Sequence, residues 1–380
     1  MKLFYKIIFI FIIALAAFLR LYHLSSIPPG VNRDEASIGF TAYSLLKTGK
    51  DEYGRLFPLS FESFGDWKLP LYIYTTIPFI KIFGLTELAV RLPSSISGIL
   101  TVALVFVLVP ILFESIPLAL ISAFILSIMP WHIHISRVES ESNVAILFCT
   151  LATILFLKAL KYKRTMYLTV AGILFALTFY TYHGNHIFTT LYALGLIFIY
   201  RNDVFRIPRW FVSAGVATIL TAIILLFTLH SADKTKISGI GIFGDPTIVH
   251  TKIELVRVDH NNPSSLFTRL IHNKPVYAFI TIGQNYLKSY SPEFLFIKGG
   301  DNQAHNIKNY GNMHPIESIF LLLGFFALMT QIKKKQYVLI LWWILVAGVA
   351  PAITKDAPHS NRMFAIVPAL SIVVAFGILY

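Results

Sequence analysis

Residues 3–19 read LFYKIIFIFIIALAAFL, an apolar run interrupted by a single charged residue, Lys6. A helix needs roughly 17–25 such residues to cross the hydrocarbon core of a bilayer. Comparable runs occupy 93–113, 143–160, 165–183, 210–229, 337–353 and 363–380, and shorter ones occupy 117–130, 186–200 and 315–331. The sequence therefore predicts an all-α polytopic membrane protein with about ten transmembrane helices.

The composition of the whole chain agrees with this class. Hydrophobic residues make up 56% of the 380 residues and charged residues only 13%, whereas soluble domains are about a quarter charged. The net charge of +13 comes from Lys and Arg in short loops, which favours contact with membrane lipid over nucleic acid. The single cysteine excludes an intrachain disulfide.

The run 69–83 is ambiguous, because it is short and contains Pro78 and Lys81. If it crossed the membrane, the basic clusters 161–164 and 333–335 would face outward, against the positive-inside rule. We therefore expect interfacial helices in the first outer loop and ten spans with both ends in the cytoplasm. The N-terminal run is expected to be an uncleaved helix and not a signal peptide, because its Ala-Leu-Ala pattern lies inside the run.

This orientation divides the chain into three regions. The first is a transmembrane core, 1–229, whose first outer loop is 20–92. The second is an outer loop region, 230–314, and the third, 315–380, contains the C-terminal transmembrane helices. The last apolar run ends at Tyr380 without a polar flank, which leaves open whether the chain continues. The outer face also receives the loops 131–142, 183–186 and 354–362.

Two adjacent acids, Asp34 and Glu35, stand in the first outer loop at the expected start of a helix. Acids at this position stabilise a helix N-terminus, and one of them can also serve as a general base at the membrane surface. Neighbouring acids need not share one role. Lys68 follows in the same loop, where it is either a lysine snorkelling at the interface or a phosphate ligand. Arg91 is interpreted as a headgroup anchor.

Further polar residues lie in the later outer loops. Arg137 is interpreted as a phosphate clamp, since its planar fork matches two anionic oxygens. His132 and His134 would share a face of an extended backbone and make a divalent metal conceivable, but His-x-His alone is a weak signal. Arg362 either anchors the last span or reaches a phosphate.

These acids and bases converge on one membrane face, while the spans are nearly free of charge at their centres. A transporter or flippase of lipid-linked glycans usually places ionisable groups or broken helices near the midplane. An enzyme acting on a lipid-linked substrate would place them at the interface. A non-catalytic scaffold is a third alternative. The pattern favours the enzyme.

Four segments resemble the GT-C superfamily of membrane glycosyltransferases, family 39 in particular, which includes protein O-mannosyltransferases and aminoarabinose transferases. They are 33–36 (Arg-Asp-Glu-Ala), 68–72 (Lys-Leu-Pro-Leu-Tyr), 84–93 (ending Arg-Leu-Pro) and 359–363 (His-Ser-Asn-Arg-Met). The chain departs from the family at Leu69, usually Pro, and at Met363, often Tyr. These departures leave the sugar and the acceptor undetermined.

The resemblance implies a GT-C-type helix bundle in the plasma membrane, with its active site facing outward. It implies inverting transfer of a sugar from a polyprenyl-phosphate carrier to a hydroxyl of a protein, lipid or glycan acceptor. Asp34 would be the base and Glu35 would orient the acceptor or Lys68. Donor phosphate would be bound by Lys68, Arg362 and Arg137. A divalent metal is optional. Expected acceptor or sugar contacts are Asp66, Trp67, Glu139, Tyr182, His183 and His186.

Overall fold

The computed structural model describes residues 3–64, 66–230, 241–242, 246–259 and 265–380. Part of the expected outer loop region 230–314, including most of its glycine cluster, therefore lies outside the described residues. The helices and strands, in chain order, are α1 (Leu3–Leu21), α2 (Arg33–Thr48), β1 (Phe61–Ser63), β2 (Asp66–Lys68), α3 (Pro70–Phe83), α4 (Glu87–Phe113), α5 (Ile116–Ile128), α6 (Pro130–Ser136), α7 (Glu141–Tyr162), α8 (Thr165–Phe179), α9 (Gly184–Ile199), α10 (Arg201–Val204), α11 (Trp210–His230), α13 (Pro246–Asp259), α14 (Leu266–Ile271), α15 (Lys274–Ser289), η1 (Glu293–Ile297), η2 (Gln303–His305), α16 (Glu317–Thr330), α17 (Lys335–Ala347), α18 (Val349–Ala352), α19 (Ser360–Met363), η3 (Phe364–Ile366) and α20 (Val367–Leu379).

The protein is an all-α, multi-pass membrane protein, as the sequence predicts. Five of the described helical segments are long and apolar enough to cross a membrane, and the bent pair α5–α6 makes a sixth candidate. Four shorter apolar helices, α8, α9, α11 and α16, lie in the same bundle. These ten segments correspond one for one to the ten apolar runs of the sequence.

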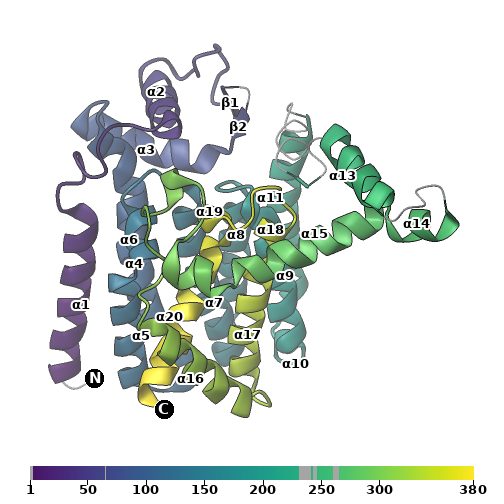
Figure 1. Cartoon of the computed structure of the whole chain (residues 1–380). Coiled ribbons are helices and arrows are strands. Elements are labelled where there is room, and N and C mark those ends of the chain that lie inside the picture. Colours follow the sequence, from purple (N-terminus) through teal and green to yellow (C-terminus); the bar gives the residue numbers. More distant parts are fainter. Residues whose placement is uncertain (1–2, 65, 231–240, 243–245, 260–264) are drawn as a thin grey trace.

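The helix α3 does not run along the bundle. It lies across one end of the bundle together with α2 and the hairpin of β1 and β2 (Figure 1). The ambiguous run 69–83 is therefore placed as the distribution of positive charge predicts. The helix begins at Pro70 because proline at the first helical position needs no hydrogen-bond acceptor for its nitrogen.

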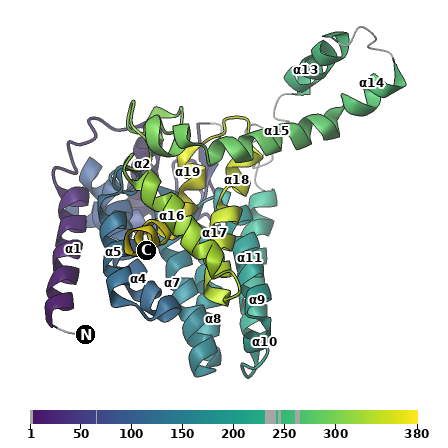
Figure 2. The same ribbon diagram turned by 60° about the horizontal axis from the view of Figure 1, so that its bottom comes forward.

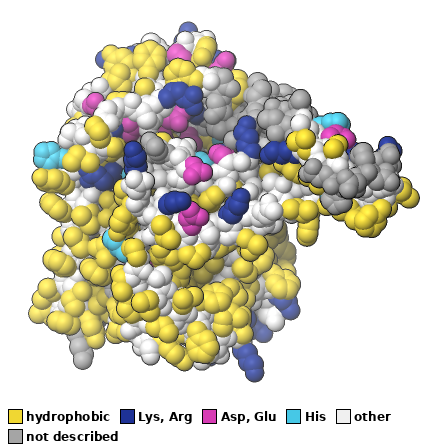
Figure 3. Space-filling model, in the orientation of Figure 1, with side chains coloured by type: hydrophobic (Ala, Val, Ile, Leu, Met, Phe, Trp, Pro, Cys, Tyr) yellow, Lys and Arg dark blue, Asp and Glu magenta, His cyan; other side chains and the backbone are white. Residues whose placement is uncertain are grey.

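The two ends of the bundle differ in charge. One end, called the basic end, carries both termini and α10, and the basic clusters 161–164, 201–209 and 333–335 lie in its turns. The other end, called the site end, carries α2, α3, α19 and the hairpin. Figure 3 shows an apolar band between the two ends and acidic side chains gathered toward the site end.

The transmembrane helices pack closely where small residues meet. A Cβ atom added to Gly324 of α16 would lie 1.8 Å from the carbonyl oxygen of Val373 in α20. One added to Gly377 would lie 1.8 Å from the carbonyl oxygen of Phe320. Because lipid tails are as apolar as leucine, close backbone packing of this kind is a main source of helix association in membranes. It fixes α20, and with it the segment that carries Arg362. Figure 2 shows α16 crossing over α20.

Candidate functional site

The first functional residues stand at the N-terminus of α2, where the chain separates the two neighbouring acids. Asn32 caps the helix: its side chain accepts a hydrogen bond from the Glu35 amide at 2.8 Å. The Glu35 carboxylate accepts in return from the Asn32 amide at 3.1 Å. This reciprocal capping box turns Glu35 toward the protein. Asp34, one residue earlier, keeps a side chain that is 51% exposed.

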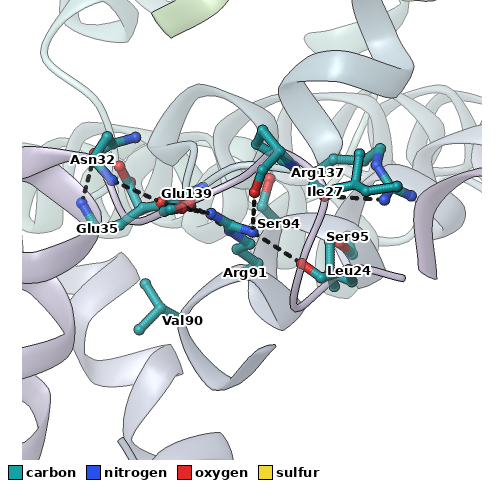
Figure 4. A network of polar contacts seen from close by, with 12 residues as sticks. Leu24, Ile27, Asn32, Glu35, Val90, Arg91, Ser94, Ser95, Arg137 and Glu139 are labelled. Carbon is teal, nitrogen blue, oxygen red and sulfur yellow. Dashed lines mark hydrogen bonds and ion pairs between the residues drawn. The ribbon is translucent and has the colours of Figure 1, made fainter. Parts of the chain in front are cut away.

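Glu35 forms an ion pair with a buried arginine, Arg91, near the N-terminus of α4. Arg91 Nε and Nη2 donate to the two carboxylate oxygens of Glu35 at 2.8 and 3.0 Å, and the Arg91 side chain has no exposed surface. Arg91 also donates to the carbonyl oxygens of Leu24, Pro28 and Gly30. Figure 4 shows this network between the α1–α2 loop and α4. The interpretation of Arg91 as a headgroup anchor is wrong, because the guanidinium is buried in the protein.

The contacts of Glu35 favour a structural role over the expected one of orienting the acceptor or Lys68. Its carboxylate is occupied by Arg91 and the Asn32 amide, and it accepts a third hydrogen bond from the Glu139 amide at 3.2 Å. What it orients is the start of α2, and therefore Asp34.

Lys68 pairs with Asp34, the exposed acid of this cluster. It is the last residue of β2 and is almost fully buried, with its Nζ 3.1 Å from Asp34 Oδ1 and 3.3 Å from the Asp34 carbonyl oxygen. A snorkelling lysine would direct its ammonium away from the protein. Lys68 instead directs it to Asp34, and the structure thus joins two of the residues that the sequence singled out.

Glu139 lies against this pair in the loop between α6 and α7. Burial raises the pKa of Glu139 well above its ordinary value, and the nearby charge of Glu141 raises it further, while Lys68 opposes the shift. Its Oε1 is buried and makes no hydrogen bond within the described structure. This setting shifts the equilibrium of the Glu139 carboxyl group toward its protonated form, which can donate a hydrogen bond.

A second cation reaches the site from the far end of the sequence. Arg362 of α19 donates through Nη1 to Thr354 Oγ1 at 2.8 Å and to Asp356, and it also hydrogen-bonds the Tyr182 hydroxyl. Burial would raise the pKa of Asp356, but the hydrogen bond and charge of Arg362 outweigh it and hold the pKa below its usual value. Asp356 therefore stays ionised beside Arg362.

Two histidines lie beside Arg362, and the sequence identified only one of them as part of a motif. The rings of His305 and His359 are 5.3 Å apart. Burial lowers the pKa of His305 to about 4 and that of His359 to about 3, and the charge of Arg362 contributes to both shifts. His305 is also close enough to Asp34 for the carboxylate to act on its pKa. No spacing signal could place His305, because it lies in an irregular segment far from residue 359.

Arg137 does not have the role that its position suggested. Its guanidinium donates to the carbonyl oxygens of Leu19, Tyr22 and Ile27 at 2.7–3.0 Å. A phosphate would have to displace these backbone acceptors. The prediction that Arg137 clamps the donor phosphate is therefore not supported by its contacts. It fastens the loop that follows α1.

The other expected contact residues are mostly bonded to the backbone. His183 Nε2 is 3.1 Å from the carbonyl oxygen of Trp67, and His186 Nε2 is 2.9 Å from that of Phe179. The Trp67 ring lies under the guanidinium of Arg55. Asp66 pairs with Ser63 in the hairpin, but its side chain lies outside what the structure describes. Tyr182 and Glu139 are thus the expected contacts that lie closest to the charged cluster.

The pair His132 and His134 is a correction to the sequence interpretation. Both residues lie in the helix α6, where positions two apart point to different sides. His132 is buried, with Nδ1 2.6 Å from Arg20 Nη2 and its ring stacked on Phe364. Among the described residues, no three His, Cys, Asp or Glu side chains are placed to hold a metal ion.

Comparison with solved structures identifies the fold of this protein. Over 98% of its length it superposes on ArnT from Cupriavidus metallidurans bound to undecaprenyl phosphate, with a TM-score of 0.60 and 12% identity. Over 98% it also superposes on the oligosaccharyltransferase AglB from Archaeoglobus fulgidus in complex with an inhibitory peptide and a dolichol-phosphate, with a TM-score of 0.58 and 13% identity. The chain has the fold of the GT-C membrane glycosyltransferases, which confirms the expected fold.

Sequence comparison matches part of the chain to a family model. Residues 68–230 match the family described as dolichyl-phosphate-mannose-protein mannosyltransferase. No curated protein matches the chain by sequence. The chain spans 59% of the length of ArnT and 50% of that of AglB.

Proposed function

We propose that the protein is a glycosyltransferase that moves a sugar from a polyprenyl-phosphate carrier to an acceptor hydroxyl, with Asp34 as the general base. The proposal rests on the different environments of the two neighbouring acids, Asp34 and Glu35. Glu35 is buried against Arg91, whereas Asp34 is exposed, is fixed at a helix N-terminus, and lies 3.1 Å from Lys68. The fold supports the reaction class, since ArnT is described as bound to undecaprenyl phosphate and AglB as bound to a dolichol-phosphate.

In the proposed reaction Asp34 takes the proton of the acceptor hydroxyl while that oxygen forms a bond to the anomeric carbon. The bond from the anomeric carbon to the phosphate oxygen breaks on the opposite face, so the configuration inverts and polyprenyl phosphate leaves. A positioned base of this kind contributes about 10²–10⁴-fold to the rate. The step needs no other reactant.

The leaving phosphate gains charge, and cations near its oxygens lower the barrier. Lys68 and Arg362 are the cations that the described residues bring to this cluster. Lys68 would bind the phosphate and Asp34 at the same time. The histidines 305 and 359 are uncharged at neutral pH because of their lowered pKa values, so they would contact the substrate as neutral hydrogen-bonding groups. Glu139 and Tyr182 are proposed as sugar or acceptor contacts.

We also propose that the protein lies in the plasma membrane and that its site end is on the non-cytoplasmic side. The basic clusters lie at the opposite end of the bundle, and short basic loops stay on the cytoplasmic side. Nucleotide-activated sugars are not available outside the cytoplasm. A lipid-linked donor is the sugar source that this orientation allows.

A transporter of lipid-linked glycans is less well supported. In the described transmembrane helices the Asp, Glu, Lys and Arg residues lie near the helix ends, for example Glu87 and Arg91 in α4 and Lys158 in α7. An intramembrane path for a charged headgroup would need ionisable groups or an interrupted helix near the midplane. The charged groups instead lie at the two ends of the bundle, and the acids of the candidate site lie at the site end.

The test is a transfer assay on the full chain in lipid nanodiscs with a panel of radiolabelled polyprenyl-phosphate sugars. Wild type should release or transfer label from one of the carriers, and Asp34→Asn should lose about 10²–10⁴-fold of that activity. Glu87→Gln is the matched control, since Glu87 is also an acid in the first turn of a helix. Equal turnover in wild type and Asp34→Asn would remove Asp34 from the mechanism. Absence of turnover with every carrier, for protein shown to be folded, would contradict the proposed donor class.

A further inference from the structure

The helices α13, α14 and α15 form an arm that projects sideways from the bundle (Figures 1 and 2). The described part of the arm comprises 246–259 and 265–289. Hydrogen bonds fasten its inner end to the bundle. Asn285 Nδ2 donates to the carbonyl oxygens of Ala352 and Thr354 at 3.1 and 2.8 Å, and the Tyr286 hydroxyl donates to that of Leu345 at 2.9 Å. The rest of α15 extends away from the core.

One face of α15 is apolar and open. Val276, Phe279, Ile280, Gly283 and Leu287 stand at positions i, i+3, i+4, i+7 and i+11 and so form a single stripe. Phe279 and Leu287 are 81% and 71% exposed, and a Cβ on Gly283 would meet nothing within 4 Å. Val276 and Ile280 line a pocket between α15 and α13, whereas Phe279 and Leu287 project from the arm.

The short helix α14 continues this apolar surface toward the tip of the arm. Leu266, Phe267, Leu270 and Ile271 are all exposed, and their spacing places them on one side of the helix. Figure 3 shows apolar side chains along the lower edge and the tip of the arm. Large exposed apolar patches are rare on protein surfaces that face water, and they indicate contact with a membrane or a partner.

The position of the arm identifies what covers this face. In Figure 1 the arm leaves the bundle at the height of the end of α1 that lies nearer the site end, where the apolar band of the transmembrane helices ends. The described arm carries five Lys and Arg residues against two acids. Arg269 and Lys274 are exposed beside the apolar surface. Helices with an apolar face, basic flanks and this position lie in the plane of the membrane boundary.

We propose that the arm is a membrane-surface element, with the apolar face of α14 and α15 inserted among the lipids at the site end. Its partner is the lipid leaflet itself, and its basic residues favour anionic headgroups. This inference concerns the arm alone and does not depend on the proposed transferase activity. The arm is nevertheless linked to the site, because Asn285 binds the carbonyl oxygen of Thr354 and the Thr354 hydroxyl binds Arg362.

The experiment measures the surroundings of single nitroxide labels on the full chain in nanodiscs. The only cysteine, Cys149, is buried, and Cys149→Ala removes it. Labels are then attached at Leu270→Cys, Phe279→Cys or Leu287→Cys on the apolar face. Matched controls on the other side of α15 are Lys274→Cys and Lys288→Cys, both at exposed positions. Collision rates are recorded with oxygen, which concentrates in lipid, and with a water-soluble nickel chelate.

The proposal predicts that labels at the three apolar positions collide several-fold more with oxygen than with the nickel chelate, and that the two lysine positions show the reverse. High nickel accessibility at positions 270, 279 and 287 would overturn it, because the face would then lie in water. Low accessibility to both reagents at these positions would also overturn it, because a protein partner or a second copy would cover the face. Because all five labelled positions are on the surface, each variant should keep the fold.

Discussion

The adjacent acids Asp34 and Glu35 should respond to nearly identical substitutions in opposite ways. Asp34→Asn and Glu35→Gln each remove one negative charge and change the side-chain shape little. We propose that the first residue acts in the chemistry and that the second stabilises the fold. The two variants therefore test the division of roles directly.

The magnitude for Glu35 follows from its burial and its bonds. Glu35→Gln leaves the guanidinium of Arg91, which has no exposed surface, without its counter-charge. Breaking a buried ion pair by removing one partner costs about 3–5 kcal/mol. The carbonyl oxygens of Leu24, Pro28 and Gly30 still accept from Arg91, which places the expected loss near the lower value. The melting temperature should fall by roughly 5 °C or more.

The corresponding loss of stability for Asp34 is small. Its ion pair with Lys68 is half exposed on the Asp34 side, and exposed pairs contribute about 0–1 kcal/mol after screening by solvent. Asp34→Asn should therefore melt within about 2 °C of wild type, while its turnover falls by about 10²–10⁴-fold. The measurements are thermal unfolding followed by size-exclusion chromatography in lipid nanodiscs, and transfer activity at a temperature where every variant is folded.

Two results would refute this reasoning. One is a Glu35→Gln variant as stable as Asp34→Asn, because the buried pair would then carry little free energy. The other is a Glu35→Gln variant that is stable but inactive, because Glu35 would then act on the substrate and not on the fold. A double variant Glu35→Gln, Arg91→Met separates the pair from its neighbours: if the ion pair is the cause, it should recover part of the stability lost in Glu35→Gln.

Three further predictions concern the cations and histidines of the site. Arg362→Lys should keep the fold but lower kcat by at least about tenfold, because lysine lacks the planar fork that holds Thr354 and Asp356; unchanged kinetics would contradict a role in the reaction. Arg137→Gln should lower the melting temperature and leave the KM for the carrier unchanged, since its partners are backbone carbonyl groups; a raised KM with normal stability would restore it as a phosphate ligand. The pKa values of His305 and His359 are lowered in the folded protein, so their contribution to stability is present above about pH 6.5 and is lost as pH falls toward about 4 and 3. The wild-type melting temperature should thus fall more between pH 6.5 and 4 than that of the double variant His305→Asn, His359→Asn. Parallel profiles of melting temperature against pH would contradict these shifts.

The sequence predicts the bundle well because lipid imposes one simple rule on it. Every transmembrane helix must be apolar over most of its length, so the spans are visible as runs. The placement of 69–83 across the bundle end needed one further rule, the distribution of positive charge, and the structure agrees. The start of α4 was less visible: α4 begins at Glu87, before the apolar run, because Thr86 caps it and its first turn carries charged residues.

The site was predictable in its parts but not in its pairings. Local sequence identified Asp34 as an acid at an expected helix start, and Lys68 and Arg362 because each directly precedes an apolar run. It could not show that Glu35 would pair with Arg91, because a contact between residues this far apart depends on how α2 lies over α4. The same limit applies to His305, which meets His359 only through the path of an irregular segment.

The arginines show why charge alone misled the sequence interpretation. In a membrane protein, a cation near the end of a span has two uses: it can face a ligand, or it can satisfy backbone carbonyl groups that helix geometry leaves without donors. Arg91 and Arg137 take the second use. Together they bind the carbonyl oxygens of five residues in the loop between α1 and α2, namely Tyr22, Leu24, Ile27, Pro28 and Gly30.

This fastening explains how Asp34 can be exposed and yet fixed. A base on a loose loop would lose much of its advantage, since small displacements of reacting groups are costly to the rate. The loop before α2 is held from below by two buried guanidinium groups, and the capping box then sets the first turn of α2. Asp34 needs no burial of its own to be positioned. Arg91, expected to anchor a headgroup, and Arg137, expected to bind phosphate, instead contribute to the proposed reaction by holding its base in place.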